Sequence, residues 1–88
     1  MDYTATTKNN VLSANQNIQP DGYASLFMKN TGTENVTIND NIVIAPGSSF
    51  SFDNLPYVTI GENTSVRFSI DDATPKLLVI KTYFQEVK

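Results

Sequence analysis

The densest acidic segment of the chain is Asp71-Asp72, followed by Thr74. Carboxylate and hydroxyl oxygens are the ligands that Ca²⁺ prefers, but the spacing does not match an EF-hand loop. Asp is also a common turn-forming residue, and Asn39-Asp40-Asn41 has the same two interpretations. We therefore predict turns at both places and no metal site.

Hydrolysis would need an activated nucleophile or a pair of carboxylates. Ser48, Ser49 and Ser51 are candidate nucleophiles, but the chain has no His and no Cys to activate or replace them. A carboxylate pair for glycoside hydrolysis would come from Asp53, Glu62, Asp71 and Glu86. No pattern places two of these in an apolar cleft. We therefore predict that the protein is not an enzyme and has no catalytic residue and no cofactor.

Tyrosine is the residue type here that favours binding. The four tyrosines are Tyr3, Tyr23, Tyr57 and Tyr83. Tyr is enriched at interface centres because its large ring is buried while its tip stays polar. Ordinary core or rim positions are the open alternative. A binding or structural role is the default expectation.

The charge distribution argues against nucleic acid as a partner. The net charge is −3, and the five lysines are scattered at positions 8, 29, 76, 81 and 88. No apolar run approaches the length of a membrane span, and the first residues have neither the basic nor the apolar region of an export signal. If Met1 is the native start, we expect synthesis in a cytoplasm without classical export.

The elements that position these residues read as β-strands. Apolar and polar residues alternate with a period of two, no segment has helical spacing, and the four prolines fall at segment boundaries. The pattern predicts strands over 11–18, 23–30, 36–38, 42–44, 50–52, 57–60, 64–70 and 77–87. Seven or eight short strands predict one all-β domain, a single antiparallel β-sandwich that is either immunoglobulin-like or jelly-roll-like.

Two turns are specific enough to predict in detail. A three-residue loop at 39–41 pairs Ile38 with Ile42 and keeps the apolar residues of the hairpin on one face, with Asn41 in the left-handed region. Pro46-Gly47 has the signature of a type II turn.

We expect one contiguous core. Its predicted members are Leu26, Val36, Ile38, Ile42, Ile44, Phe50, Phe52, Val66, Phe68, Ile70, Leu78, Ile80 and Phe84. Strands 23–30 and 77–87 are apolar on both faces, so the other face is left for a partner, either a second copy or a larger assembly. This reasoning makes Tyr23, Phe27, Leu77, Val79 and Tyr83 interface candidates.

Residues 1–10 are polar and have little apolar surface with which to offset the entropy of ordering. We expect an N-terminal arm over 1–10, ordered by pairing with a neighbouring subunit, and a β-sandwich domain over 11–88. Tyr3, Thr4, Thr6 and Thr7 are the interface candidates of this arm.

The segment from Phe27 to Phe52, FMKNTGTENVTINDNIVIAPGSSFSF, resembles small β-sandwich structural proteins of bacteriophages. In that pattern an apolar strand ends in Asn-x-Gly, here Asn30 and Gly32, and a V-x-I hairpin follows. A Pro-Gly turn, here Pro46-Gly47, and an aromatic strand complete it. The segment also resembles immunoglobulin-like modules of bacterial surface proteins, and it covers under a third of the chain.

The phage resemblance implies a virion structural protein, such as a minor capsid, decoration, penton or spike-base component. Its expected partners are itself and the major capsid protein or other virion proteins, and its expected location is the virion, after synthesis in the host cytoplasm. The alternatives are an immunoglobulin-like adhesion or carbohydrate-binding module of a bacterial surface protein, and an intracellular adaptor or inhibitor.

Overall fold

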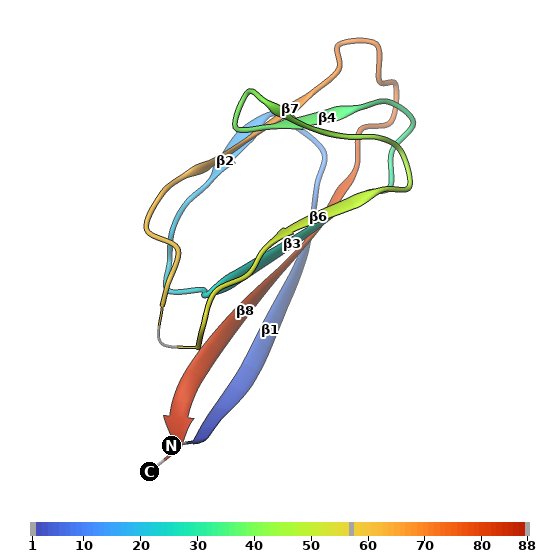
Figure 1. Cartoon of the computed structure of the whole chain (residues 1–88). Coiled ribbons are helices and arrows are strands. Elements are labelled where there is room, and N and C mark those ends of the chain that lie inside the picture. The colour runs from blue at the N-terminus through green and yellow to red at the C-terminus, as the bar shows by residue number, and fades with distance from the viewer. Residues whose placement is uncertain (1, 57, 88) are drawn as a thin grey trace.

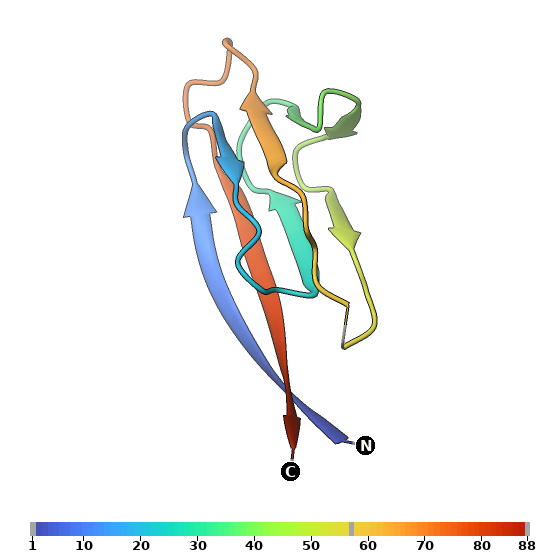
Figure 2. The ribbon, with the colours of Figure 1, turned by 90° about the vertical axis from the view of Figure 1, so that its left-hand side faces the viewer.

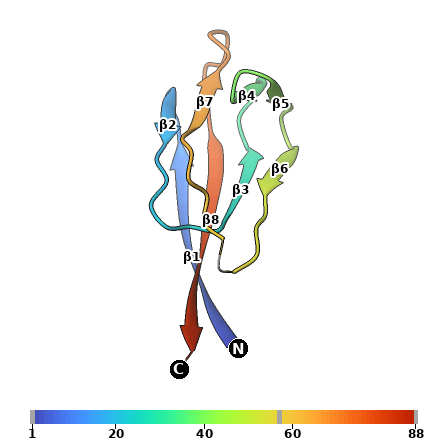
Figure 3. The ribbon, with the colours of Figure 1, turned by 60° about the vertical axis from the view of Figure 1, so that its left-hand side comes forward.

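The structure, a computed structural model, describes residues 2–56 and 58–87, and these form eight strands and no helix. The strands are β1 (Asp2–Leu12), β2 (Gln16–Ile18), β3 (Ser25–Asn30), β4 (Val36–Ile38), β5 (Ile42–Ile44), β6 (Ser49–Phe52), β7 (Thr64–Phe68) and β8 (Leu77–Val87). They form two antiparallel sheets, β1-β8-β3-β6 and β2-β7-β4-β5 (Figures 1 and 3). The predicted all-β architecture is confirmed.

The strands pair from the outside of the chain inward. β1 pairs with β8, β2 with β7, β3 with β6, and β4 with β5. This is the pairing of one long hairpin that has been folded over, and the additional pairs β3–β8 and β4–β7 divide it into two sheets. Of the two sandwich types expected, this strand order is that of a jelly roll.

One buried cluster draws residues from both sheets. It contains Leu12, Ile18, Tyr23, Leu26, Met28, Val36, Ile38, Ile44, Val66, Leu77 and Val79, with Ile42, Phe52, Ile60, Phe68 and Tyr83 packed against it. Eight of the predicted core residues are in this set. Because the apolar residues on one face of each sheet meet in one cluster, the hydrophobic effect holds the two sheets together.

The predicted faces of β8 are reversed. Leu77 and Val79 are in the core, whereas Leu78, Ile80 and Phe84, predicted to be core, are half-buried on the opposite face. When both faces of a strand carry apolar residues, the sequence does not alternate and does not indicate which face is buried. A register shift of one residue moves every side chain of the strand to the opposite face.

Two other predicted core residues lie at strand margins. Phe50 is 37% exposed on β6, which is the edge strand of its sheet. Ile70 is 99% exposed because β7 ends at Phe68, two residues earlier than the predicted strand. Ile70 lies beyond the last β4–β7 ladder pair, Val36 with Phe68, and has no opposite sheet to pack against.

The turns agree with prediction except in which residues of the 39–41 loop are left-handed. The hairpin pairs Ile38 with Ile42, as predicted, and the Asn41 N–H donates to the Ile38 carbonyl. Asn39 (φ 52°) and Asp40 (φ 65°), rather than Asn41, are left-handed, which is a type I′ arrangement and suits the twist of the strands. At Pro46, Gly47 has φ 83° and the Ser48 N–H donates to Ala45, as a type II turn requires.

Three predicted strands differ from the structure only at their ends, since β3 begins at Ser25, β6 at Ser49 and β7 ends at Phe68, and two others differ more. The segment 11–18 is interrupted at 13–15, where the chain leaves β1 and enters the second sheet as β2. The segment 57–60 begins at Tyr57, outside the described residues, and 58–60 contains no strand. Within 58–60, the Ile60 N–H donates to the Tyr23 carbonyl and the Ile60 side chain packs against the core.

The Asn-x-Gly sequence ends β3 for a structural reason. The buried Asn30 donates through Nδ2 to the carbonyls of Glu34 (2.7 Å) and Ile44 (2.9 Å) and accepts from the Gly32 N–H (2.9 Å). A Cβ on Gly32 would lie 3.0 Å from the Lys76 nitrogen, so a side chain there would push on the backbone that precedes β8. These residues hold the loop after β3 against β5 and β8.

The expected arm is part of the sheet. Residues 2–10 belong to β1, which pairs with β8 of the same chain over eleven residues without interruption. Backbone pairing within the chain therefore corrects the expectation that a neighbouring subunit orders this segment. β3 pairs with β8 only as far as Thr82. Beyond that pair, residues 2–6 and 83–87 continue as a two-stranded ribbon that projects from a molecule of 49 × 19 × 17 Å, and the Tyr83 side chain at its base packs against the core (Figure 2).

Candidate functional site

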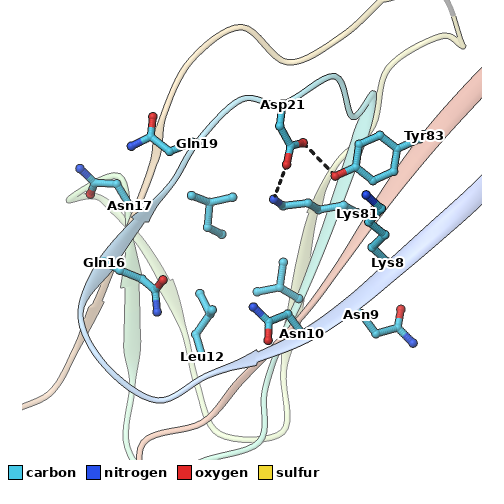
Figure 4. Close-up of a pocket in the computed structure, with 12 residues that line it drawn as sticks. Lys8, Asn9, Asn10, Leu12, Gln16, Asn17, Gln19, Asp21, Lys81 and Tyr83 are labelled. Carbon is cyan, nitrogen blue, oxygen red and sulfur yellow. Dashed lines mark hydrogen bonds and ion pairs between the residues drawn. The ribbon is translucent and has the colours of Figure 1, made fainter.

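An open pocket of about 430 Å³ lies where the edge strands β1 and β2 leave the sandwich unclosed (Figure 4). Its floor consists of the core residues Leu12, Ile18 and Val79. It is also lined by Lys8, Asn9, Asn10, Gln16, Asn17, Gln19, Asp21, Lys81 and Tyr83. Of these, Asn9 and Asn17 carry their side chains on the outer faces of their sheets, opposite Ile80 and Ser65. A pocket with this lining can offer many hydrogen bonds to a neutral polar ligand.

Asp21 organises one end of the pocket (Figure 4). Its carboxylate accepts a hydrogen bond from the Tyr83 hydroxyl at 2.8 Å and lies 3.0 Å from the Lys81 ammonium. Asp21 occupies the turn before β3, whereas both partners are on β8, so the interaction ties this turn to the sheet. Because the ion pair is partly exposed, its net contribution is small, about 0–1 kcal/mol.

The protonation of this pair follows from the contacts. Partial burial opposes ionisation of Asp21, but the hydrogen bonds from Lys81 and Tyr83 outweigh it and hold the pKa of Asp21 below its usual value. Burial, the hydrogen bond to Asp21 and the negative charge of Asp21 raise the pKa of Tyr83 to about 12. At neutral pH the phenol is therefore a donor and the carboxylate an acceptor.

The aromatic rings at the pocket are already engaged. The Lys8 ammonium lies 4.9 Å from the centre of the Tyr83 ring, and Lys81 lies 5.1 Å from the centre of the Tyr23 ring. The two rings meet edge to face at 6.3 Å. This packing stabilises the pocket end of β8, and the cation over Tyr83 competes with any ligand that would stack there.

A second feature is the uncovered face of the sheet β1-β8-β3-β6. We call it the outer apolar face, and its residues are Val11, Phe27, Leu78, Ile80 and Phe84. Val11 is 54% exposed, and the other four are half-buried. By register, Val11 is opposite Leu78 and Phe27 is opposite Ile80, so these side chains are neighbours on one surface.

The second sheet presents a different surface. On its outer side Thr37 is opposite Arg67 and Val43, and Asn17 is opposite Ser65. Arg67 donates to the Gln16 carbonyl at 3.1 Å and to Asn17 Oδ1 at 3.3 Å, which attaches β2 to β7. Of the five residues named on this outer side, Val43 is the one apolar residue, and it is 60% exposed.

The structure separates the predicted interface residues into three groups. Tyr23 and Leu77 are 0% exposed and Val79 is 2% exposed, so these three belong to the core and offer no surface to a partner. Phe27 lies on the outer apolar face and Tyr83 at the pocket. The remaining four are on β1, in the ribbon or at its base: Tyr3, Thr4, Thr6 and Thr7.

Leu78, Ile80 and Phe84 on the outer apolar face were predicted as core. The sequence of 77–87 is apolar on both faces, and this pattern predicts that one face is not packed against the other sheet. It does not identify which of the two faces that is. Aligning β8 with β3 decides this, because Met28 and Asn30 are buried and their ladder partners are Val79 and Leu77.

The acidic and hydroxyl candidates have local structural contacts. Asp72 Oδ1 accepts from the Thr33 hydroxyl at 2.8 Å and from the Thr74 N–H at 3.0 Å, which closes the loop before β8 against the loop after β3. Ser51 donates to Asp53 at 3.1 Å on the surface. Within residues 2–56 and 58–87, three or more His, Cys, Asp or Glu side chains do not gather in one place.

The described part of the chain contains no helix long and apolar enough to cross a membrane. Comparison of the sequence with protein-family models and with curated proteins finds no match. The functional argument therefore depends on the two surfaces described above, the amide-lined pocket and the outer apolar face.

Proposed function

We propose that this chain is a non-enzymatic structural protein of a bacteriophage virion that acts through protein–protein contacts. In this role it is a minor capsid, decoration, penton or spike-base component. Its partners are further copies of itself and the major capsid protein or other virion proteins.

The observation that carries the proposal is the outer apolar face. Half-buried Phe27 and Ile80 are ladder neighbours on a sheet face that no described residue of the chain covers, and half-buried Phe84 lies farther along β8 on the same face. The outer side of the other sheet carries Thr37, Arg67 and Asn17 beside the exposed Val43. Uncovered apolar patches of this kind mark protein interaction sites. The jelly-roll strand order adds support by analogy of fold alone, since jelly rolls build viral capsid domains as well as lectins and cupins.

A carbohydrate-binding role is the second candidate, and the amide-lined pocket favours it. Asn and Gln side chains both donate and accept hydrogen bonds, as recognition of sugar hydroxyls requires. The cation over Tyr83 disfavours it, because it competes with sugar stacking on that ring. Protein–protein contact through the outer apolar face remains the better supported function.

Mass spectrometry of gradient-purified particles tests the proposal. The chain is expected at a constant ratio to the major capsid protein through successive purification steps, while an abundant host cytoplasmic protein is depleted. A chain that is expressed in infected cells but lost from purified particles contradicts the virion role. Retention of the purified protein on a glycan array, abolished by Gln16→Ala, would favour the second candidate instead.

A further inference from the structure

β1 is an edge strand with one side open. It pairs with β8 on one side, and no strand among residues 2–56 and 58–87 pairs with its other side. It is eleven residues long, and nine of these are exposed. Such an edge is a template for another strand.

The hydrogen bonds of β8 show which groups of β1 are open. At the two ends of the β3–β8 ladder, the Thr82 carbonyl accepts from the Ala24 N–H and the Lys76 carbonyl accepts from the Thr31 N–H. The even-numbered residues of β8 therefore direct their backbone groups toward β3 and the odd-numbered residues toward β1. Odd residues of β8 are opposite even residues of β1. The N–H and C=O groups of Ala5, Thr7 and Asn9 therefore point away from β8.

The sequence of β1 does little to protect this edge. It contains no Pro or Gly, and its register with β8 has no bulge that would turn the edge away. Its one lysine, Lys8, lies over the Tyr83 ring. Val11 shows how an open amide is satisfied locally, because its N–H donates to the Asn10 side chain at 2.9 Å.

We propose that the open edge of β1 pairs antiparallel with β1 of a second copy, about a two-fold axis at Ala5. Odd residues must face odd residues, since they carry the outward backbone groups. Centring on Ala5 satisfies this and places Asp2 opposite Lys8 of the second copy, twice in each dimer. It also places Thr4 opposite Thr6 and Ala5 opposite itself. Centring on Lys8 would instead place two ammonium groups opposite each other.

The charges and the shape of the chain both suit this register. Asp2 is exposed, and no ion pair links it to residues 2–56 or 58–87. Residues 2–6 are in the ribbon that projects beyond the sandwich (Figure 2). A two-fold axis there directs the two sandwiches to opposite ends, and pairing over residues 2–8 brings no other part of the domains together. The inference rests on the proposed function and deepens it by assigning the strand edge and register through which copies of the chain pair.

Charge reversal tests the register. Asp2→Lys and Lys8→Asp each place like charges opposite one another, and each is expected to raise the dimer dissociation constant about tenfold, measured by sedimentation equilibrium. The double variant D2K/K8D restores opposite charges and is expected to return the constant to that of the unmodified chain. Loss of the Lys8 contact with Tyr83 is common to K8D and the double variant, so it does not produce the rescue.

Proline substitution tests the edge itself. Ala5→Pro removes an N–H that β8 does not use, so the chain is expected to remain folded by circular dichroism and to become monomeric. The matched control is Thr6→Pro, which removes an N–H that points to β8 and is expected to lower the unfolding temperature. Hydrogen exchange adds a direct readout, since the amides of Ala5 and Thr7 should gain protection as concentration rises.

Two results would overturn the inference. One is a chain that stays monomeric from micromolar to millimolar concentration. The other is a dimer that survives Ala5→Pro and shows no rescue in D2K/K8D. Both results are measured in solution on the isolated chain. They are therefore separate from the particle experiment, in which absence of the chain from purified particles contradicts the proposed function alone.

Discussion

Asp21 and Tyr83 show how single residues set the chemistry of the pocket end of β8. The two side chains come from distant parts of the chain, and their hydrogen bond at 2.8 Å needs a neutral phenol and a charged carboxylate. Both pKa shifts, lower for Asp21 and higher for Tyr83, favour that combination. The contact is therefore present across the neutral range.

The pKa shift of Tyr83 makes folding stability depend on pH in a definite direction. The pKa of Tyr83 is raised from 10.0 to about 12, so its contribution to stability is complete below pH 10 and is lost as pH rises toward 12. We expect the stability advantage of the unmodified chain over Tyr83→Phe to shrink across this interval. Urea unfolding of both proteins at a series of pH values measures it. An advantage that stays constant above pH 10 would contradict the contact. The lowered pKa of Asp21 acts at the acid end, where its contribution is lost as pH falls below about 4.

At the scale of the element, β8 determines both surfaces of its sheet. Its odd residues Leu77 and Val79 face the core, and its even residues Leu78 and Ile80 face outward. Adjacent residues of one strand therefore have opposite environments. This makes a matched pair of substitutions the sharpest test of the faces.

Val79→Thr places a hydroxyl in the core and is expected to lower the free energy of unfolding by about 1–3 kcal/mol. Ile80→Thr makes a similar change on the outer apolar face, where water reaches the hydroxyl, and is expected to cost less than about 1 kcal/mol. Urea denaturation compares the two. Equal losses, or a larger loss for Ile80→Thr, would reverse the face assignment. Under the proposed function, Ile80→Thr should also reduce incorporation into particles.

At the scale of the whole molecule, the outermost strands of the chain are partners. β1 and β8 form the longest ladder, and its inner half joins the sandwich while its outer half projects. Core packing reaches β1 only at Leu12, which is 6% exposed. The two halves of β1 therefore differ in what they contribute to stability.

Deletions separate these contributions. Removal of residues 2–6 is expected to leave a cooperatively folded sandwich, because those residues pair only with 83–87 of β8. Removal of residues 2–12 takes Leu12 from the core and exposes the whole edge of β8, and is expected to unfold the domain. Thermal unfolding followed by circular dichroism distinguishes the two. A domain that unfolds after the short deletion would show that the ribbon is part of the cooperative unit.

Local pattern and turn chemistry determined much of this fold. Period-two alternation predicted the all-β class, the Ile38–Ile42 pairing follows from hairpin length, and the Pro46-Gly47 turn follows from the left-handed torsion that Gly permits. Each depends on residues close together in the chain. The absence of His and Cys likewise limited the chemistry without reference to any structure.

Only the tertiary structure decided which face of β8 is buried and what residues 2–10 pair with. Both depend on a partner far away in sequence: β3 and β1 for the faces of β8, and β8 for the N-terminal strand. The pocket has the same origin, since its lysines, Asp21 and Tyr83 come from three separate segments. Alternation within one strand defines two faces but does not say which face meets the opposite sheet, because burial is a property of the pair of sheets.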